Sequence, residues 1–247
     1  MQVSVFLNKL RTRVLPNLKY LPQSKIAYCH ICQKRRFIVS LSDGEERKLC
    51  IACMSNLRYQ MIASYMTRSP NNLQNKVVWE VSPESPLSRL LIKNACAQYV
   101  NSFYSDEFTP GYIDQYGLRC EDLTATSFED NSIDIIISSD VLEHLEDIEA
   151  AFDETLRILK PGGMHLFTVP NCPKTIKRAT VTNGKIEHFE EPEYHSDPLN
   201  PKEGILAFWH FGEDATALFS RPGLTVDIVE GPCGKDKRIL WRALKSG

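Results

Sequence analysis

The stretch that decides the fold covers residues 119–170 and reads RCEDLTATSFEDNSIDIIISSDVLEHLEDIEAAFDETLRILKPGGMHLFTVP. Residues 133–138 are nearly all branched aliphatic, which is typical of a central parallel strand covered on both faces. Residues 147–159 carry apolar side chains at helical spacing, and the Lys-Pro-Gly-Gly run at 160–163 ends this helix. The apolar run 164–169 predicts a second strand. The order strand, helix, strand predicts a parallel sheet.

Similar elements flank this unit on both sides. Their alternation predicts an α/β fold with a doubly wound parallel sheet, which binds ligands at the carboxyl ends of its strands. Two final strands joined by the short link 231–234 are expected to be antiparallel. Residues 171–211 interrupt the alternation with a segment rich in proline and charge, and we expect this insertion to form the acceptor site. Further strands are expected at 76–81, 98–104, 119–121, 224–229 and 238–244, and helices at 87–96 and 214–220.

Two C-x2-C pairs lie near the N-terminus, separated by 17 residues: Cys29 with Cys32, and Cys50 with Cys53. Zinc prefers four ligands in a tetrahedron, and each pair offers two thiolates from one tight turn. The segment between the pairs predicts strand, turn and strand, with Asp43-Gly44 at the turn. The pattern therefore predicts a zinc ribbon. Because all four ligands come from the protein, the zinc would be structural; two disulfides are the alternative interpretation.

The composition is that of an ordinary globular protein, since 43% of the 247 residues are hydrophobic and 24% are charged, which excludes a disordered or coiled-coil chain. The net charge of −2 conceals an asymmetry. Residues 1–68 hold 12 Lys and Arg against 3 Asp and Glu, whereas residues 69–247 hold 17 against 28. This predicts two parts with different partners. No segment reads as a membrane span or a secretory signal, so we expect a cytoplasmic protein with reduced thiols.

Three segments follow from these patterns. Residues 1–27 form a basic arm, residues 28–68 the ribbon and a following helix at 53–67, and residues 69–247 the α/β domain. The arm places apolar residues at helical spacing from 3 to 15. This helix either lies on an anionic surface or packs on the protein's own body.

Residues 119–170 resemble the type 11 group of class I S-adenosylmethionine-dependent methyltransferases. The resemblance rests on four motifs in this order: Asp122-Leu123, the run Phe128-Glu129-Asp130-x2-Ile133-Asp134, Val141-Leu142-Glu143-His144, and Leu156-Arg157-Ile158-Leu159-Lys160-Pro161-Gly162-Gly163. It implies a seven-stranded, mostly parallel Rossmann-like sheet with a reversed final hairpin. It also implies S-adenosylmethionine as the cofactor, bound across the ends of the first, second and fourth strands. The ribbon resembles cysteine knuckles that precede this domain in some bacterial members.

The resemblance implies a role for each cofactor-binding position. Glu80 would bind the ammonium end of the cofactor, Asp122 would accept a hydrogen bond from the adenine amino group, and the Leu123 backbone would bind the ring edge. Ser139 and Asp140 would line the methionine moiety. Each role suits the residue, because carboxylates accept from ammonium and amine donors.

The loop after the first strand departs from the family. Val81, Ser82 and Pro83 would pass beside the cofactor, but residues 82–86 read Ser-Pro-Glu-Ser-Pro where a glycine-rich loop is usual. The acidic residue that would bind the ribose at the end of the second strand is also not evident. These departures leave a pseudoenzyme as an alternative.

Candidates for the catalytic step are His144, His195 and Tyr194, with His210 a further histidine of the insertion. Methyl transfer from a sulfonium mainly requires alignment and exclusion of water, and a general base only for a hydroxyl or protonated amine acceptor. The alternative for Glu143-His144 is that they only cap backbone groups of the following helix.

Two functions are consistent with these patterns. The first is a methyltransferase whose acceptor is a small molecule, a glycan or a lipid head group; a nucleic acid is less favoured, because the aromatic residues form no recognition motif. The alternative is a catalytically weak or inactive methyltransferase-fold protein that contacts an anionic partner through its basic zinc module.

Overall fold

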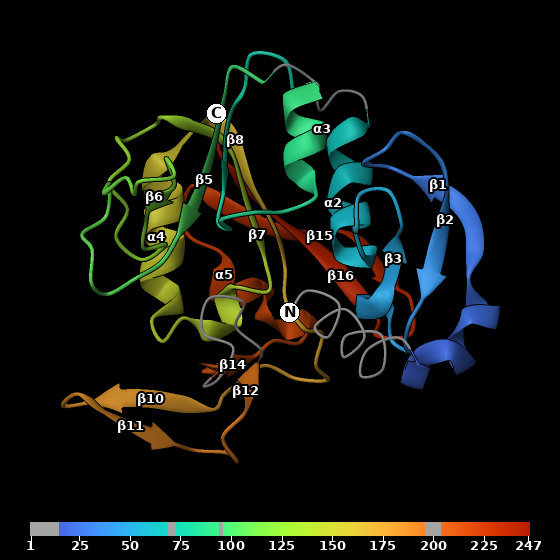
Figure 1. The fold of residues 1–247 in the computed structure, drawn as a ribbon. Helices are drawn as coiled ribbons and strands as arrows, with labels where there is room; N and C mark the ends of the chain where they lie inside the picture. Colours follow the sequence, from blue (N-terminus) through green and yellow to red (C-terminus); the bar gives the residue numbers. More distant parts are fainter. Residues whose placement is uncertain (1–14, 69–72, 94–95, 196–203) are drawn as a thin grey trace.

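The computed structural model describes residues 15–68, 73–93, 96–195 and 204–247 (Figure 1). Within these residues a seven-stranded sheet forms the centre of the molecule. Its strands, in spatial order, are β15 (Leu224–Cys233), β16 (Arg238–Lys245), β8 (Leu159–Thr168), β7 (Ile133–Ser139), β4 (Val77–Glu80), β5 (Gln98–Phe103) and β6 (Arg119–Cys120). β16 is antiparallel to both of its neighbours, and all other adjacent pairs are parallel. The expected mostly parallel sheet with a reversed final hairpin is confirmed.

Helices cover both faces of this sheet. α2 (Leu57–Thr67) and α3 (Leu87–Lys93) pack on one face, and α4 (Ile148–Ile158) and α5 (Thr216–Phe219) pack on the other. Figure 1 shows α2 and α3 side by side, with α4 on the opposite side of the sheet. Among the described residues, no helix has the length and apolar character needed to cross a membrane.

Strand β7 is buried on both faces, as its aliphatic sequence predicts. Ile133 and Ile136 join the apolar cluster that includes α4, whereas Ile135 and Ile137 join the cluster that includes α2 and α3. The change of side from Ile135 to Ile136 and back at Ile137 follows from the two-residue period of a strand. Ile133 departs from this period because the pairing of β7 with β8 is irregular between Ile133 and Ile135. One strand therefore ties together two separate apolar layers.

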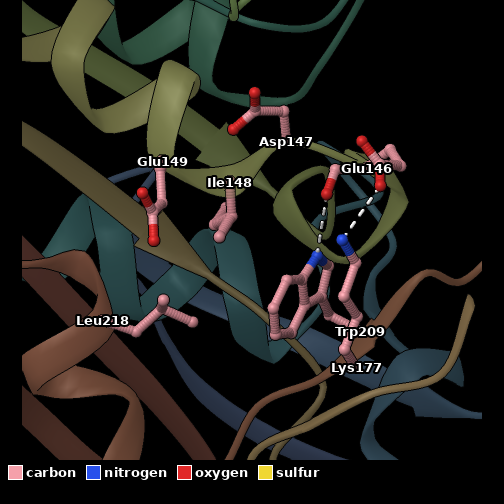
Figure 2. Close-up of a pocket in the computed structure, with 7 residues that line it drawn as sticks. All are labelled: Glu146, Asp147, Ile148, Glu149, Lys177, Trp209 and Leu218. Atoms are coloured by element: carbon pink, nitrogen blue, oxygen red, sulfur yellow. Dashed lines mark hydrogen bonds and ion pairs between the residues drawn. The ribbon is translucent and has the colours of Figure 1, made fainter. Parts of the chain in front are cut away.

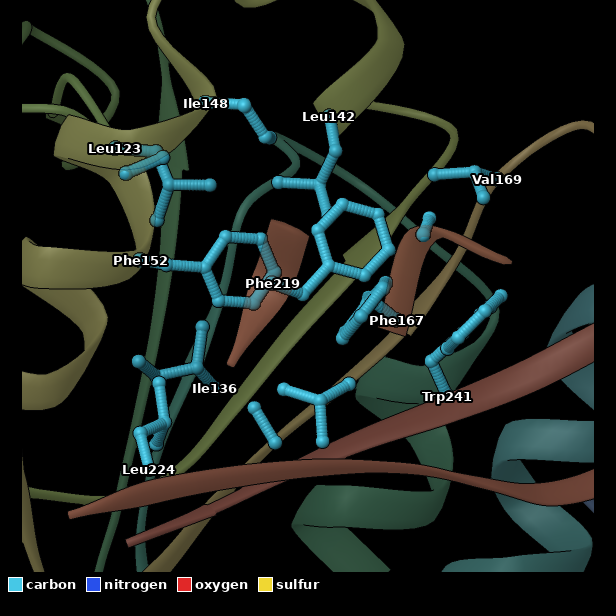
Figure 3. Close-up of a cluster of buried hydrophobic side chains, with 14 of the residues drawn as sticks. Leu123, Ile136, Leu142, Ile148, Phe152, Phe167, Val169, Phe219, Leu224 and Trp241 are labelled. Carbon is cyan, nitrogen blue, oxygen red and sulfur yellow. The ribbon is translucent and has the colours of Figure 1, made fainter. Parts of the chain in front are cut away.

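Aromatic rings fill the cluster on the α4 side (Figure 3). Phe219 of α5 stacks on Phe152 of α4 with ring centroids 4.8 Å apart, and meets Phe167 and Trp241 edge to face at 5.3 and 5.5 Å. All four side chains are fully buried. Each such pair contributes about 0.5–1.5 kcal/mol beyond its burial. The rings hold α5, and with it the end of the insertion, against the sheet.

The N-terminal region forms a three-stranded antiparallel ribbon after a 3₁₀ helix (Leu15–Gln23). The predicted pair of strands is confirmed, and an additional strand begins at Lys25, inside the segment assigned to the arm. The helix predicted at 53–67 begins only at Leu57, because Asn56 caps it by accepting from the Tyr59 amide at 3.4 Å. The amphipathic helix predicted at 3–15 falls almost entirely outside the described residues. The ribbon strands are β1 (Lys25–Cys29), β2 (Lys34–Ser40) and β3 (Lys48–Cys50), with a 3₁₀ turn (Glu45–Arg47) before β3.

The ribbon shares its core with the large sheet. Cys29, Cys50 and Cys53 belong to the same buried cluster as Leu90 of α3 and Leu240 of β16. Polar contacts add to this interface. The Glu45 amide donates to Asp236 at 2.9 Å, and Lys235 pairs with Asp43 at 2.9 Å. The ribbon is therefore packed against the α/β domain through side-chain contacts, in addition to its connection along the chain.

Three details differ from the sequence-based expectations. β8 begins at Leu159 and includes residues 160–163, although the sequence predicts this strand only from 164. The link expected at 231–234 lies largely within strand β15, which continues to Cys233 through two irregularities in its pairing with β16. The described part of the insertion at 171–211 contains three short antiparallel pairs. The pair formed by 179–182 and 185–188 is mostly exposed to water, and each strand of the other two pairs is only two residues long, so the insertion shows little hydrophobic periodicity. The pairs are β9 (Ile176–Lys177) with β14 (Trp209–His210), β10 (Ala179–Thr182) with β11 (Lys185–His188), and β12 (Tyr194–His195) with β13 (Ile205–Leu206).

Candidate functional site

The four predicted zinc ligands come together. The Sγ atoms of Cys29 and Cys53 are 3.6 Å apart, those of Cys32 and Cys50 are 3.9 Å apart, and all four lie within 4.8 Å of one another. Tetrahedral zinc with bonds of about 2.3 Å places its sulfur ligands about 3.8 Å apart. None of the four cysteines forms a disulfide, which argues against the two-disulfide interpretation. The donor set and its spacing fit zinc.

Hydrogen-bond donors around Cys29 favour its thiolate form. The Cys32 amide and the Gln60 amide side chain donate to its sulfur at 3.3 and 3.2 Å. Burial raises the pKa of this thiol, but these donors outweigh it and lower the pKa to about 7. Gln60 belongs to α2, so the helix that follows the ribbon and packs on the large sheet supports the metal site.

A cavity of about 590 Å³ lies at the carboxyl ends of β4, β5 and β7. β4 sits between the two halves of the sheet, where the direction of winding reverses, and ligands of such sheets bind at this point. The volume is that of a small-molecule site. Five lining residues are acidic, and none is Lys or Arg. The lining residues are Val81, Tyr104, Glu121, Asp122, Leu123, Thr124, Asp140, Val141, His144, Leu145, Glu146, Asp147, Ile205 and Phe208.

Half of the predicted cofactor positions line this cavity. Val81, Asp122, Leu123 and Asp140 do so, together with the predicted catalytic residue His144. The remaining positions lie nearby without lining it, and they are Glu80, Ser82, Pro83 and Ser139. Three separate segments of the chain therefore meet where the resemblance implies the cofactor.

Glu80 is engaged inside the protein. Its carboxylate is 2% exposed and accepts a hydrogen bond from the Tyr99 hydroxyl at 2.5 Å, and a second from the Ser85 side chain. Burial raises its pKa. Beside it, Asn101 donates to the Pro83 carbonyl at 2.6 Å and holds the glycine-poor loop. Glu80 therefore braces the loop, at a position where the resemblance implies contact with the cofactor.

Asp122 is held in one orientation by its neighbour. Its Oδ1 atom accepts from the Thr124 amide at 2.8 Å and from the Thr124 hydroxyl at 2.7 Å. Tyr104, which follows β5 directly, lines the same cavity and stands near the position where an acidic residue was sought. Sequence reasoning missed Tyr104, because a single exposed tyrosine after a strand carries no distinctive signal.

Asp140 is held by two arginines from distant segments. Arg58 of α2 contacts its carboxylate at 2.8 Å and Arg238 of β16 at 3.0 Å. The same two arginines bind Glu46 of the ribbon at 2.9 and 3.0 Å. Asp140 itself has a φ of 53°, a left-handed conformation that is uncommon outside glycine. The network therefore links the ribbon to the turn that borders the cavity.

Glu143 lies beside this network with an unusual environment. Its side chain is 1% exposed, and neither carboxylate oxygen accepts a hydrogen bond from another described residue. Burial and the nearby charge of Asp140 raise its pKa well above the usual range. The alternative that this glutamate only caps the next helix is wrong, because Asp147 caps α4 through the Ala150 amide at 2.9 Å.

Two of the predicted catalytic residues converge on Glu143. Its Oε1 atom lies 3.8 Å from His144 Nε2 and 3.8 Å from His195 Nδ1, and the two rings are 4.9 Å apart. Tyr194 is 57% exposed and does not line the cavity. His210 pairs with Glu193 at 2.9 Å. The insertion thus brings one histidine, His195, to the edge of the site.

A smaller hollow of about 260 Å³ shares Glu146 and Asp147 with the larger cavity (Figure 2). Lys177 pairs with the Glu146 carboxylate at 2.9 Å, and the Trp209 indole donates to the Glu146 carbonyl at 3.4 Å. Lys177 also lies over the Trp209 ring at 5.4 Å. These contacts fasten the base of the insertion to the wall of the cavity.

Comparison with known proteins agrees with this geometry. Residues 90–167 match the family model described as a methyltransferase domain. A probable S-adenosylmethionine-dependent methyltransferase of Mycolicibacterium smegmatis is 35% identical over 110 residues, 43% of this chain and 40% of that protein. Phosphoethanolamine N-methyltransferase 2 of Caenorhabditis elegans is 42% identical over 48 residues, 19% of this chain and 11% of that protein. The matches therefore span less than half the length of these relatives.

The fold has a counterpart among solved structures. A Listeria monocytogenes protein described as an S-adenosylmethionine-dependent methyltransferase superposes with a TM-score of 0.50 at 11% identity, covering 74% of this chain and 96% of that chain. At this identity the likeness concerns the fold alone. The matched family model, the mycobacterial relative and the sheet order agree: residues 90–167 are similar to a methyltransferase domain, within a fold that S-adenosylmethionine-dependent methyltransferases share and after a four-cysteine ribbon.

Proposed function

We propose that the chain is an S-adenosylmethionine-dependent methyltransferase that moves a methyl group to its acceptor by in-line displacement, with a structural zinc in the ribbon. The observation that carries the proposal is the cavity at the reversal of the sheet, where Asp122, Asp140 and His144 arrive from separate segments. When bound, the cofactor supplies a methyl group on a positively charged sulfur. The acidic lining suits a ligand of that charge.

The residues of the cavity have distinct proposed tasks. Thr124 holds one oxygen of Asp122, so the other oxygen is oriented to accept from an amino group of the adenine. The Leu123 backbone would bind the ring edge. Asp140, fixed by its two arginines, would border the methionine moiety. This division places the adenine near β6 and the reacting end near β7 and the insertion.

The acceptor is proposed to enter from the side of the insertion. Ile205 and Phe208 line the cavity there, and His144 and His195 stand at the same edge. Either histidine would take the proton of a hydroxyl or ammonium acceptor, with Tyr194 further out. The apolar walls and the small volume favour a small molecule, a glycan or a lipid head group over a nucleic acid.

The zinc is proposed to act through packing. A small ribbon buries too little apolar surface to fold alone, so metal binding would supply folding free energy. Because Glu46 of the ribbon and Arg58 of α2 belong to the network around Asp140, an ordered ribbon would also keep the wall of the cavity in place.

One observation favours a second candidate function. The Glu80 carboxylate is occupied by Tyr99 and Ser85, and the loop at 82–86 lacks glycine, so the ammonium end of the cofactor would be bound weakly. The chain would then be a weakly active or inactive binding protein that contacts an anionic partner through its basic N-terminal region.

Titration calorimetry with S-adenosylmethionine tests the proposal. We expect saturable binding, weakened about tenfold to hundredfold in Asp122→Asn, because a hydrogen bond to a charged group is worth about 1.5–3 kcal/mol. Glu129→Gln, an exposed carboxyl outside the cavity, is the matched control and should bind normally. No binding at millimolar cofactor would leave the second candidate, and normal binding by Asp122→Asn would refute the adenine assignment.

A further inference from the structure

We propose that Glu143, His144 and His195 form a binding site for a divalent transition-metal ion at the edge of the cavity, separate from the four-cysteine site. The three ligand atoms, Glu143 Oε1, His144 Nε2 and His195 Nδ1, all lie within 4.8 Å of one another. Glu143 and His144 come from the turn after β7, and His195 comes from the insertion. Two imidazoles and one carboxylate suit ions such as Mn²⁺, Fe²⁺, Co²⁺ and Zn²⁺.

The outer hydrogen bonds set the tautomer of both histidines. His144 Nδ1 lies 2.8 Å from the Leu206 carbonyl oxygen, which only accepts, so Nδ1 carries the hydrogen and Nε2 carries the lone pair. His195 Nε2 lies 3.0 Å from a Glu193 carboxylate oxygen, so its lone pair is on Nδ1. These two nitrogens are the ones 3.8 Å from Glu143. Metal-binding histidines are usually oriented by such outer partners.

Glu143 supplies an independent indication of a ligand. A carboxylate that is 1% exposed normally accepts several hydrogen bonds, yet neither oxygen accepts one from another described residue. The nearby arginines Arg58 and Arg238 form ion pairs with Asp140 and Glu46, and neither donates a hydrogen bond to Glu143. A bound cation would compensate the carboxylate.

The two distances from Glu143 to the histidines require a contraction of less than about 1 Å, and the two histidine ligand atoms lie within 4.8 Å of each other. Metal–ligand bonds of about 2.1 Å at 90–110° place ligand atoms about 3.0–3.4 Å apart, so the distances of 3.8 Å must shorten by about half an ångström. Three protein ligands would leave positions on the ion open. Because His144 lines the cavity, an oxygen of the acceptor could occupy such a position, an extension that rests on the proposed methyltransferase function. With the ion bound, His144 and His195 would be its ligands, and the ion would replace the histidine base by acidifying the acceptor oxygen.

The test is metal binding by the full chain, with zinc retained in the ribbon. The probes are Mn²⁺, followed by the loss of its free-ion electron paramagnetic resonance signal, and Co²⁺, followed by equilibrium dialysis. Thiolates prefer softer ions than Mn²⁺, so the Mn²⁺ signal separates this site from the ribbon. We expect one ion per chain in the wild type and at least tenfold weaker binding in Glu143→Gln and in His195→Asn.

His188→Asn is the matched control, because His188 is an exposed histidine of the same insertion outside the cluster. Its metal affinity should equal that of the wild type. Thermal unfolding of each variant without added metal shows that it is folded. The proposal is overturned by the absence of saturable binding of both ions, or by unchanged binding in folded Glu143→Gln and His195→Asn. Neither result depends on cofactor binding or methyl transfer, so it leaves the proposed function intact.

Discussion

The buried histidine of β8 makes the stability of the protein depend on pH in a calculable way. His165 is fully buried between α4 and the sheet, where its ring contacts the Ser138 hydroxyl at 2.8 Å and the Thr155 hydroxyl at 3.4 Å. Burial lowers its pKa from 6.5 to about 3. The folded protein therefore holds this ring neutral at pH values where the unfolded chain protonates it.

Between pH 3 and 6.5 the unfolded state binds more protons at this site, so the free energy of unfolding rises with pH and levels off above 6.5. With pKa values of 6.5 unfolded and about 3 folded, the loss of unfolding free energy is small at pH 7 and about 2 kcal/mol at pH 5. His165 alone should therefore cost about 2 kcal/mol between these two pH values.

Urea unfolding of the wild type and of His165→Gln at pH 7 and pH 5 measures this contribution. Glutamine keeps a hydrogen-bonding group near Ser138 and does not titrate, so the variant should lose about 2 kcal/mol less unfolding free energy than the wild type over this interval. The variant must be compared with the wild type because the pKa of Glu143 is raised, so its contribution to the free energy of unfolding falls as pH rises and partly offsets that of His165. His188→Gln, at an exposed position, should follow the wild type. Equal losses in wild type and His165→Gln would refute the assignment of a neutral buried ring.

Three further predictions concern the ribbon, its network and the aromatic core. Cys50→Ser should lose the zinc measured by elemental analysis and lower the melting temperature by about 10 °C, because metal binding supplies folding free energy; full zinc retention would contradict this. Arg58→Met should weaken S-adenosylmethionine binding about tenfold in calorimetry, because Asp140 loses one of its two arginine partners. Arg68→Met removes only the ion pair of the exposed Arg68 with Glu230 and should leave this binding unchanged. Phe219→Ala should cost about 3–5 kcal/mol in urea unfolding, and a loss below 1 kcal/mol would show that α5 is not held by its ring contacts.

Features set by neighbours in the chain were predictable. The aliphatic run of β7, the amphipathic α4 and the short spacing of the cysteine pairs each fix a local conformation, and the structure confirms them. Element boundaries were less accurate. β15 runs beyond its predicted end because pairing with β16, not local propensity, sustains it to Cys233. The sequence predicts no regular structure for the insertion, because the mostly exposed pair at 179–188 and the two-residue strands beside it carry no periodic signal.

The candidate site divides in the same way. The family resemblance and the positions of predicted strand ends together predict four residues of the cavity: Asp122, Leu123, Asp140 and His144. The partners of these residues were not found. Tyr99 binds Glu80, and Arg238 binds Asp140. No pattern in the sequence predicts either pairing.

By itself, the sequence determined a doubly wound sheet, a four-cysteine ribbon and the strand ends at which a ligand binds, because these depend on periodicity and spacing over short stretches of chain. Only the tertiary structure decided that Glu46, Arg58, Asp140 and Arg238 form one charge network, and that His195 reaches Glu143 and His144. The physical reason is that a charge or a ligand atom acts over a few ångströms in space. Which distant residues come within that distance depends on how the helices, the ribbon and the insertion pack on the sheet.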